Sequence, residues 1–301
     1  MCANILWYNW RMKRIGFIGA GKAGFSLGRH VSERGGGEYE VAGYFSRDPE
    51  AVRAAASFAG GRAFENAEGL AAECDLLLLT VPDGQISDVW RQLRTANLHH
   101  SDSLLVGHCS GSQGSDVFGS IADNSVFGSI HPLVALHDRE TAYKRLVGAY
   151  FTIEGGASFT SFASDLLTTL GNPFSIIAAE KKTLYHAASV MVSNLVCALT
   201  YEGMETLKAC GLDEGFAENA WRSLFLGNAE NIASLGPVRA LTGPVERGDA
   251  GTVARHLEAL TGDAREIYLR LSSALINAAQ EKNPGRDYSG IRQLLQGDKH
   301  I

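Results

Sequence analysis

The glycine-rich segment "GFIGAGKAG" (residues 16–24) constrains the fold of this chain more than any other stretch. Gly19, Gly21 and Gly24 stand in GxGxxG spacing between a run typical of a strand and a run typical of a helix. In a parallel α/β sheet the first glycine permits a tight turn, the second lets the backbone approach a pyrophosphate, and the third lets the helix pack closely on the strand. A diphosphate then lies at the helix N-terminus, where unpaired N–H groups and the helix dipole favour negative charge. The segment therefore predicts a dinucleotide-binding βαβ unit.

The chain divides into two parts with different sequence patterns. In the first part, β-rich runs alternate with helical runs, which indicates a parallel sheet wound with helices. We expect strands at residues 14–19, 40–46, 75–82, 103–111, 125–133, 149–155 and 173–178, and helices at residues 22–33, 50–58, 85–94 and 159–170. After residue 178 the β-rich runs end, and no proline occurs between Pro173 and Pro237, which favours bundled helices. The predicted fold is α/β, with a Rossmann doubly wound parallel sheet in residues 12–178 followed by an all-helical domain in residues 179–301.

Composition excludes several classes of protein. The 301 residues are 45% hydrophobic, which is enough for two packed cores. The formal charge of -6 is spread over interspersed acids and bases, and no Lys/Arg block could neutralise several neighbouring phosphates, so we expect no nucleic-acid partner. The five cysteines are widely spaced and form no CxxC pair, which favours neither a disulfide framework nor a metal site. A reducing cytoplasm fits this usage.

The start of the chain does not predict a signal peptide, and the most apolar helical run does not predict a membrane-spanning helix. Residues 1–11 lack a leucine-rich run and a small-residue cleavage site, so we expect an extension ahead of Met12 rather than a signal peptide. The run Ala187–Leu199 is interrupted by three polar residues, and we expect it to be too short and too polar to cross a bilayer.

Three segments are expected to contact the cofactor. The glycine turn and the end of the predicted strand at residues 75–82 contribute Gly19, Ala20, Gly21, Lys22, Ala23, Gly24, Val81 and Pro82. The next predicted strand after the turn ends in Ser46 and Arg47, where an acid would accept hydrogen bonds from the ribose of NAD. A serine hydroxyl beside a guanidinium suits a 2′-phosphate, which favours NADP. Asp48 follows directly and could serve NAD instead.

The ends of the next two strands should face the nicotinamide, because ligands in open α/β sheets bind at the carboxyl ends of the strands. In "HCSGS", Ser110 could hydrogen-bond a substrate or the nicotinamide amide, whereas Cys109 is better interpreted as a small buried residue than as a nucleophile. "SIHPL" places His131 before Pro132, whose ring fixes an extended exit that would aim the imidazole outward. A purely structural histidine is an equal alternative.

A polar stripe marks the first helix expected in the second domain. Four residues fall within roughly 60° of one another at about 100° per residue: Lys182, His186, Ser189 and Ser193. Apolar residues flank the stripe, so we expect a helix buried nearly all round whose stripe faces something polar, most simply an aqueous cleft. Alternatively, Lys182 and His186 are solvated first turns. A lysine and a histidine one turn apart could supply the proton that reduction of C=O or C=N requires.

The segment "LTGPVERGD" (residues 241–249) interrupts the helical texture with two glycines and a proline. We expect Asp249 to cap the helical run Gly251–Leu260. Arg247 could hold an anionic substrate group, or pair with Asp249 or Glu246 inside a plain inter-helix turn, and composition leaves both open. Candidate substrate contacts are Asn194, Thr242, Arg247 and Asp249; Asn194 lies off the polar stripe and could instead bridge helices.

Five segments carry a resemblance to a known family: "GFIGAGKAG", "HCSGS", "GSIHPL", "YHAASVMVSN" and "ALTGPVERGD" with the following "HLEAL". The chain resembles a bacterial family of NADP-dependent oxidoreductases in which a Rossmann-like domain precedes a helical domain of unknown function. It is more distantly similar to ketopantoate reductase, pyrroline-5-carboxylate reductase, the deazaflavin-dependent NADP reductases and the 6-phosphogluconate dehydrogenase group. In several of these relatives the helical domain dimerises and supplies Lys or Asn to the active site. The sugar-acid dehydrogenases place Asn four residues after Lys, whereas here His186 follows Lys182 at that offset.

Two hypotheses follow. The first is an NADP-linked oxidoreductase that moves a hydride to or from a C=O or C=N group of a small, anionic metabolite. Its reaction centre would be Ser110, His131, Lys182 and His186, with Arg247 holding the anion, in a homodimer formed through the helical domain. The second is a regulatory or scaffold protein that binds NADP without chemistry. The polar stripe favours the enzyme, because a cleft lined with polar groups serves a scaffold poorly.

Overall fold

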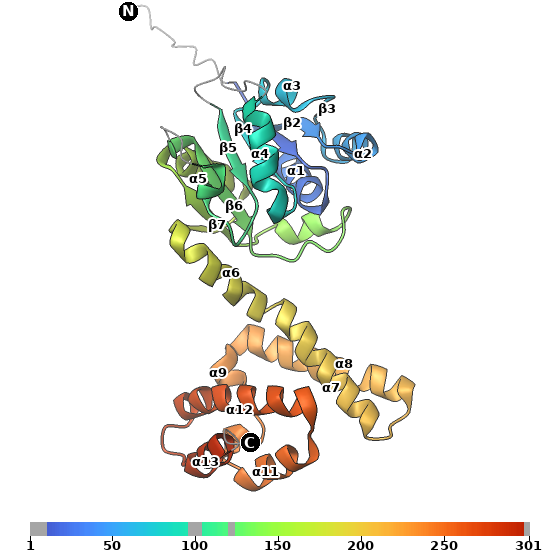
Figure 1. Ribbon diagram of the computed structural model, residues 1–301, viewed down its shortest axis with the longest axis vertical. Coiled ribbons are helices and arrows are strands. Elements are labelled where there is room, and N and C mark those ends of the chain that lie inside the picture. Colours follow the sequence, from blue (N-terminus) through green and yellow to red (C-terminus); the bar gives the residue numbers. More distant parts are fainter. Residues whose placement is uncertain (1–10, 96–103, 120–123, 298–301) are drawn as a thin grey trace, which may run out of the picture. The chain divides into compact units, whose positions relative to one another are not determined.

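The structure, a computed structural model, describes residues 11–95, 104–119 and 124–297 (Figure 1). The expected extension before Met12 therefore lies almost wholly outside the described residues. By its contacts the chain splits into two compact units, residues 1–190 and 191–301. The first unit thus extends beyond the predicted boundary at residue 178 and takes in the beginning of the helix that carries the polar stripe.

The first unit is built on an eight-stranded sheet in the order β3-β2-β1-β4-β5-β6-β7-β8. Strands β1 to β6 run parallel, β7 is antiparallel to β6, and β8 is parallel to β7. The strands are β1 (Lys13–Ile18), β2 (Tyr39–Phe45), β3 (Arg62–Ala63), β4 (Leu76–Leu79), β5 (Leu105–His108), β6 (Phe127–Pro132), β7 (Phe151–Gly155) and β8 (Phe174–Ile176). The predicted Rossmann doubly wound sheet is confirmed, and only the short edge strand β3 was not expected.

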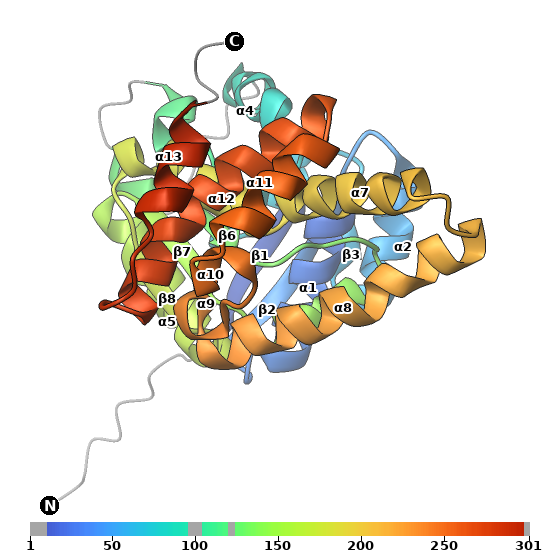
Figure 2. The same cartoon turned by 90° about the horizontal axis from the view of Figure 1, so that it is seen from below.

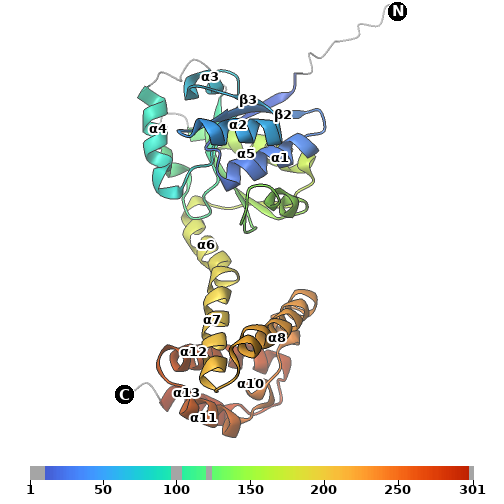
Figure 3. The same cartoon turned by 90° about the vertical axis from the view of Figure 1, so that its right-hand side faces the viewer.

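Helices cover both faces of this sheet, which is why its central strands β4 and β5 are buried throughout (Figure 3). One face carries α1 (Lys22–Arg34), α2 (Pro49–Ala59) and α5 (Ala157–Leu170) over a core that includes Phe17 and Phe159. The other carries α3 (Ala67–Ala71) and α4 (Ile86–Thr95) over a core that includes Leu77 and Trp90. Short 3-10 turns at Asp83–Gln85, Ser115–Phe118, Asn124–Val126, Ala142–Leu146 and Ala179–Lys181 link the elements.

The second unit is entirely helical among its described residues, as the sequence predicts (Figure 2). Its helices are α7 (Asn194–Ala209), α8 (Glu214–Leu235), α9 (Pro237–Ala240), α10 (Pro244–Arg247), α11 (Ala250–Ala259), α12 (Gly262–Lys282) and α13 (Ser289–Gly297). A small apolar cluster, which includes Val253 and Ile276, joins α10 to α13. No residue of α7 or α8 belongs to the cores described for this unit.

The helix that bears the polar stripe differs from the expectation in two ways. The structure ends α6 (Lys182–Met191) before Ser193, whose φ of -128° and ψ of -82° are not helical, and α7 begins at Asn194. Moreover, its apolar faces are exposed: Leu184 is 70% and Val192 is 80% exposed. The prediction of one continuous helix buried nearly all round is therefore wrong for the single chain, because only the first turns of α6 pack on the sheet.

By length and composition alone, the described residues contain one segment that could cross a membrane, Ala179–Ala209, with a mean hydropathy of 1.3. The prediction that this region is too short and too polar does not hold by that criterion. The break before Asn194 interrupts the segment, and Lys182 is bonded into the sheet unit. One such segment is weak evidence for a membrane address, because apolar core helices meet the same criterion.

Candidate functional site

The three glycines of the turn have different surroundings, which shows what each one does. Gly19 has φ +109°, and a Cβ there would come within 2.7 Å of the Thr80 carbonyl oxygen. A Cβ on Gly24 would collide with the Gly19 carbonyl oxygen and come within 2.7 Å of Thr80 Oγ1. A Cβ on Gly21 would meet nothing within 4 Å. The first and third glycines are therefore required by the fold itself, whereas the second leaves open space beside the start of α1, where a pyrophosphate would bind.

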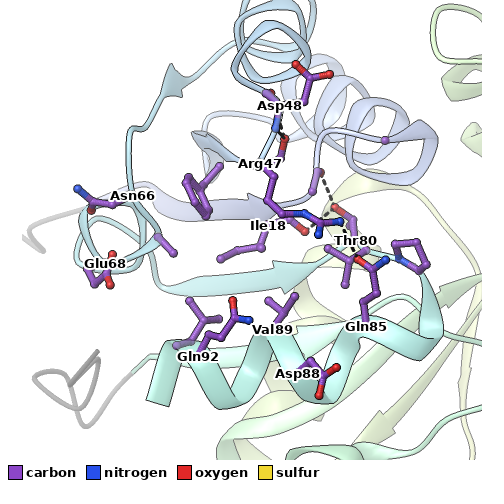
Figure 4. A pocket seen from close by; sticks show the side chains of 18 residues that line it. Ile18, Arg47, Asp48, Asn66, Glu68, Thr80, Gln85, Asp88, Val89 and Gln92 are labelled. Atoms are coloured by element: carbon purple, nitrogen blue, oxygen red, sulfur yellow. Dashed lines mark hydrogen bonds between the residues drawn. The ribbon is translucent and has the colours of Figure 1, made fainter. Parts of the chain in front are cut away.

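A cavity of about 730 Å³ opens beside this turn (Figure 4). Six of the predicted cofactor residues line it: Gly19, Gly21, Ser46, Arg47, Val81 and Pro82. The other four predicted residues do not line it: Ala20, Lys22, Ala23 and Gly24. No sequence pattern indicated Asn66, Gln85 and Gln92, which reach the cavity from the start of α3, the turn before α4 and α4 itself.

At the mouth of this cavity, Arg47 and Asp48 have separate roles. Asp48 Oδ1 accepts hydrogen bonds from the backbone N–H groups of Glu50 and Ala51, at 3.0 and 3.2 Å, and so caps α2. Arg47 Nη2 instead reaches across the cavity to Gln85 Oε1 at 3.3 Å (Figure 4). Asp48 thus commits one carboxylate oxygen to the helix cap while it also lines the cavity, and the Arg47 guanidinium faces the cavity.

Asp83, one residue beyond the cavity-lining Pro82, connects the cavity to the end of β5. Its Oδ2 accepts hydrogen bonds from Ser110 Oγ at 2.6 Å and from Ser112 Oγ at 3.2 Å. Ser110 Oγ in turn accepts from the backbone N–H groups of Ser112 and Gln113, at 3.2 and 3.1 Å. A hydroxyl has one proton and two lone pairs, and all three are engaged here. Ser110 therefore shapes the loop after β5. Sequence reasoning missed Asp83, although its place after the fourth strand could have indicated it.

His131, at the end of β6, lies among aromatic side chains from α6. Its Nδ1 is 2.8 Å from the Tyr185 hydroxyl, and its ring centroid is 6.1 Å from that of His186. A Cβ on Gly111 would come within 2.8 Å of His131 Nε2 and 2.7 Å of His186 Cδ2, so only glycine lets the loop pass between these rings. Burial, together with Lys182 and His186, lowers the pKa of His131 to about 4. The structure thus brings His131 and His186 together beside the loop that contains Ser110.

Lys182 is 1% exposed and faces polar groups of the sheet unit rather than water. Its Nζ donates hydrogen bonds to the Ser110 carbonyl oxygen at 2.9 Å and to Ser129 Oγ at 2.6 Å. Ser129 Oγ donates to Glu154 Oε2 at 3.2 Å, and Glu154 also accepts from the N–H and hydroxyl of Ser115. Burial lowers the pKa of Lys182, and the Glu154 carboxylate opposes that shift. The lysine is the polar anchor of α6 on the sheet.

The neighbouring side chains of β5 are structural. His108 is fully buried, its Nδ1 accepts a hydrogen bond from the Ser110 N–H at 3.1 Å, and burial lowers its pKa to about 4. Burial raises the pKa of the Cys109 thiol to about 12, and the side chain packs against the apolar core. Cys109 therefore stays a protonated thiol, which agrees with its interpretation as a small apolar residue rather than a nucleophile.

In the second unit, residues 241–249 form a one-turn helix, α10, between Gly243 (φ +95°) and Gly248 (φ +76°). Glu246 ties it down by accepting from Asn283 at 2.7 Å and from Arg286 at 2.9 Å. The interruption of the helices is therefore a short turn between two glycines that is hydrogen-bonded to residues at the end of α12.

The predicted substrate residues of this unit differ in availability. Asp249 accepts hydrogen bonds from the N–H and hydroxyl of Thr252, at 3.0 and 2.7 Å, so the predicted cap of α11 is confirmed. Arg247 is exposed and forms no ion pair with any acid in the described parts of the chain. Thr242 and Asn194 are also exposed, and Asn194 Oδ1 accepts from Ser193 Oγ at 3.1 Å.

Comparisons with known proteins agree with this architecture. Residues 14–106 match the family described as NADP oxidoreductase coenzyme F420-dependent, and residues 149–275 match the domain of unknown function DUF2520. The sequence matches no curated protein. Protein TM1727 from Thermotoga maritima is 28% identical, with a TM-score of 0.69 over 89% of this chain and 99% of that one.

Two more distant structures share the fold. The NADP oxidoreductase-like protein BF3122 from Bacteroides fragilis is 20% identical, with a TM-score of 0.65 over 88% of this chain and 98% of that one. A pyrroline-5-carboxylate reductase from Coxiella burnetii is 16% identical, with a TM-score of 0.55 over 90% of this chain and 99% of that one.

The fold, the open glycine turn and these matches define the class: the chain is an oxidoreductase with a nicotinamide-dinucleotide-binding fold. More particularly, it joins an NADP-oxidoreductase-like domain to a DUF2520 domain, the pair of domains in the family that its sequence resembles.

Proposed function

We propose that this protein is an NADP-dependent oxidoreductase that transfers a hydride to or from a C=O or C=N group of a small, anionic metabolite. The observation that carries the proposal is the step from Pro82, which lines the dinucleotide cavity, to Asp83, which holds the loop beside His131 and His186. The cofactor cavity and the pair His131 and His186 thus lie at the carboxyl ends of the neighbouring strands β4, β5 and β6.

The residues of the cavity suit NADP better than NAD. The space left by Gly21 fits a pyrophosphate, and the guanidinium of Arg47 beside the Ser46 hydroxyl fits a 2′-phosphate. Asp48 Oδ1 is held by the backbone N–H groups at the start of α2, which fixes this carboxylate on the helix terminus. We therefore expect NADPH to bind at least about tenfold more tightly than NADH, and Arg47→Ala to remove most of that preference.

In the proposed reaction the nicotinamide supplies or accepts the hydride, and the chain manages the proton and the polarised bond. His186 is the proposed proton donor, because its imidazole lies beside His131 at the same loop and imidazole is the commonest general acid in proteins. His131 is the proposed hydrogen-bond donor to the substrate oxygen or nitrogen. Lys182 holds the Ser110 carbonyl in place and adds positive charge near the site. Arg247 is the proposed cation for an anionic substrate group.

The test begins with NADPH binding, measured by fluorescence, followed by NADPH oxidation against a panel of small keto and imino acids. We expect His131→Gln and His186→Gln each to lower turnover about 100-fold or more while leaving NADPH affinity unchanged. His137→Gln, at an exposed histidine, is the matched control. Lys182 is a poorer choice, because its removal would leave Glu154 as a buried charge. Tight NADPH binding with no hydride transfer to any substrate would favour the non-catalytic alternative.

We also propose that the protein is a homodimer formed through α7 and α8. Large apolar residues are exposed along both helices in the single chain: Leu195, Leu199, Tyr201, Phe216, Leu224 and Leu226. Exposed apolar surface of this kind marks a protein interface more often than a free surface. A second copy offers the same face, so the contact can close with twofold symmetry.

A further inference from the structure

Tyr185 contacts the proposed reaction centre, although no sequence pattern distinguished it from its neighbours. Its hydroxyl is 2.8 Å from His131 Nδ1, and the two rings meet edge to face with centroids 5.6 Å apart. Burial raises the pKa of the phenol, so Tyr185 keeps its proton at neutral pH. A protonated phenol beside an imidazole nitrogen can either donate its hydrogen or accept one.

His131 has one ring proton to place. The groups that face it are Lys182 and His186 from α6, Asp83 from the loop after β4, and His108 from β5, and burial dominates over all of them in lowering its pKa to about 4. A neutral imidazole carries its hydrogen on one nitrogen and a lone pair on the other. Nδ1 faces Tyr185, whereas Nε2 faces Gly111 on the loop after β5. The direction of the Tyr185 hydrogen bond therefore decides what Nε2 presents.

Relative acidity sets that direction. A phenol is more acidic than a neutral imidazole N–H, so it is the stronger donor of the pair. The phenol proton is therefore directed at Nδ1, 2.8 Å away.

We propose that Tyr185 is a positioning residue that donates to His131 Nδ1 and thereby holds His131 as the Nε2–H tautomer. The inference rests on the proposed function only for its consequence: Nε2–H then serves as a neutral hydrogen-bond donor to the substrate oxygen or nitrogen. As a hydride adds to carbon, the electron pair of the C=O or C=N bond moves to that atom, and His186 delivers the proton that completes the alcohol or amine. His131 keeps its own proton throughout, because the proton that the substrate atom takes up comes from His186.

The tautomer can be measured without any substrate. In full-length protein labelled with ¹⁵N-histidine, the two ring nitrogens of a neutral histidine give well-separated shifts, and His131→Gln identifies the His131 signals. We expect the wild-type signals to report Nε2–H at neutral pH. In Tyr185→Phe, which keeps the ring and removes the hydroxyl, we expect the signals to shift toward Nδ1–H or an average of both forms. Tyr150→Phe, at a tyrosine that is 66% exposed, is the control and should leave them unchanged.

Nδ1–H in the wild-type protein, or a fully Nε2–H His131 in Tyr185→Phe, would overturn the proposal. If the protein turns over a substrate, Tyr185→Phe should lower kcat about tenfold or more with little change in the KM for NADPH, because a wrong tautomer removes a donor used in the transition state. The tautomer result and the turnover result are separate readouts. Failure to find a substrate would therefore count against the proposed function and leave the tautomer test standing.

Discussion

The two units of this chain bury their side chains to different degrees, and the difference shows which unit is complete by itself. The sheet unit has an apolar core on each face, and its strands β4 and β5 are buried along their whole length. In the helical unit a small core joins α10 to α13, while α7 contains no buried residue. Hydrophobic burial is the main stabilising contribution to folding. The sheet unit can therefore hold a rigid cofactor site, whereas α7 and α8 leave large apolar side chains exposed in the single chain.

The largest expected effect is on the stability of the sheet unit, and it comes from substitutions in the glycine turn. Gly24→Val should destabilise the protein by about 3 kcal/mol or more, because the added Cβ meets the Gly19 carbonyl rather than a flexible side chain. Gly21→Ala adds a methyl into open space, so it should keep the wild-type stability and lose NADPH affinity. Thermal unfolding and NADPH titration of both variants separate the two effects. Equal loss of stability in both would contradict the division of roles among these glycines.

The exposed apolar surface of the helical unit can be tested by a charged residue in the proposed interface. Leu224 on α8 is 77% exposed, and Leu224→Asp should convert a dimer of 32.2 kDa chains into monomers, because the dimer would have to bury an unpaired carboxylate. Light scattering during size-exclusion chromatography gives the mass. Ile176→Asp, at a 60% exposed apolar residue of β8 in the sheet unit, is the control and should stay dimeric. A wild-type protein that is already monomeric at micromolar concentration would refute the proposed pairing.

Acid should affect the sheet unit through its buried histidines. The pKa of His108 is lowered from 6.5 to about 4 in the folded protein. Between these two pH values the unfolded chain binds a proton at His108 and the folded chain does not. The stability that this neutral histidine contributes is complete above pH 6.5 and is lost as the pH falls toward 4, by about 3 kcal/mol. Denaturant unfolding at pH 7 and pH 5 should show the loss in wild type and a smaller one in His108→Gln. An identical pH dependence in the two proteins would exclude His108 as its source.

The smallest expected effect concerns the cap in the helical unit. Asp249→Ala should cost about 1 kcal/mol, because it removes the acceptor for the Thr252 N–H at the start of α11. Asp249→Asn keeps an acceptor oxygen and should cost only a few tenths of that amount. Denaturant titration measures both. A loss of turnover in Asp249→Asn at unchanged stability would show that the carboxylate also contacts substrate.

Local patterns predicted the parts of the molecule that local chemistry determines. The GxGxxG spacing, the alternation of strands and helices, and the cap at Asp249 each depend on residues close in sequence, and the structure confirms all three. The roles of Ser110 and Lys182 depend on Asp83, Ser129 and Glu154, which come from other strands and loops. A helical stripe indicates that polar residues share a face and cannot say whether that face meets water or buried acceptors.

The same limit explains why Tyr185 was not predicted. It lies off the stripe on α6, and its partner His131 comes from the end of β6, far away in the sequence. The apolar residues that flank the stripe were expected to be buried because of their composition, but composition does not state which surface covers them.

The proposed function requires that a dinucleotide bound in the cavity place its nicotinamide ring beside His131 and His186. The most direct measurement is an isotope-filtered NOE experiment on full-length protein that carries ¹³C-labelled histidine and is saturated with NADP⁺. The account predicts a cross-peak between the nicotinamide H4 proton and a ring proton of His131 or His186, which disappears in the corresponding Gln variant. Cofactor signals that show firm binding, yet no contact between H4 and either histidine, would contradict it.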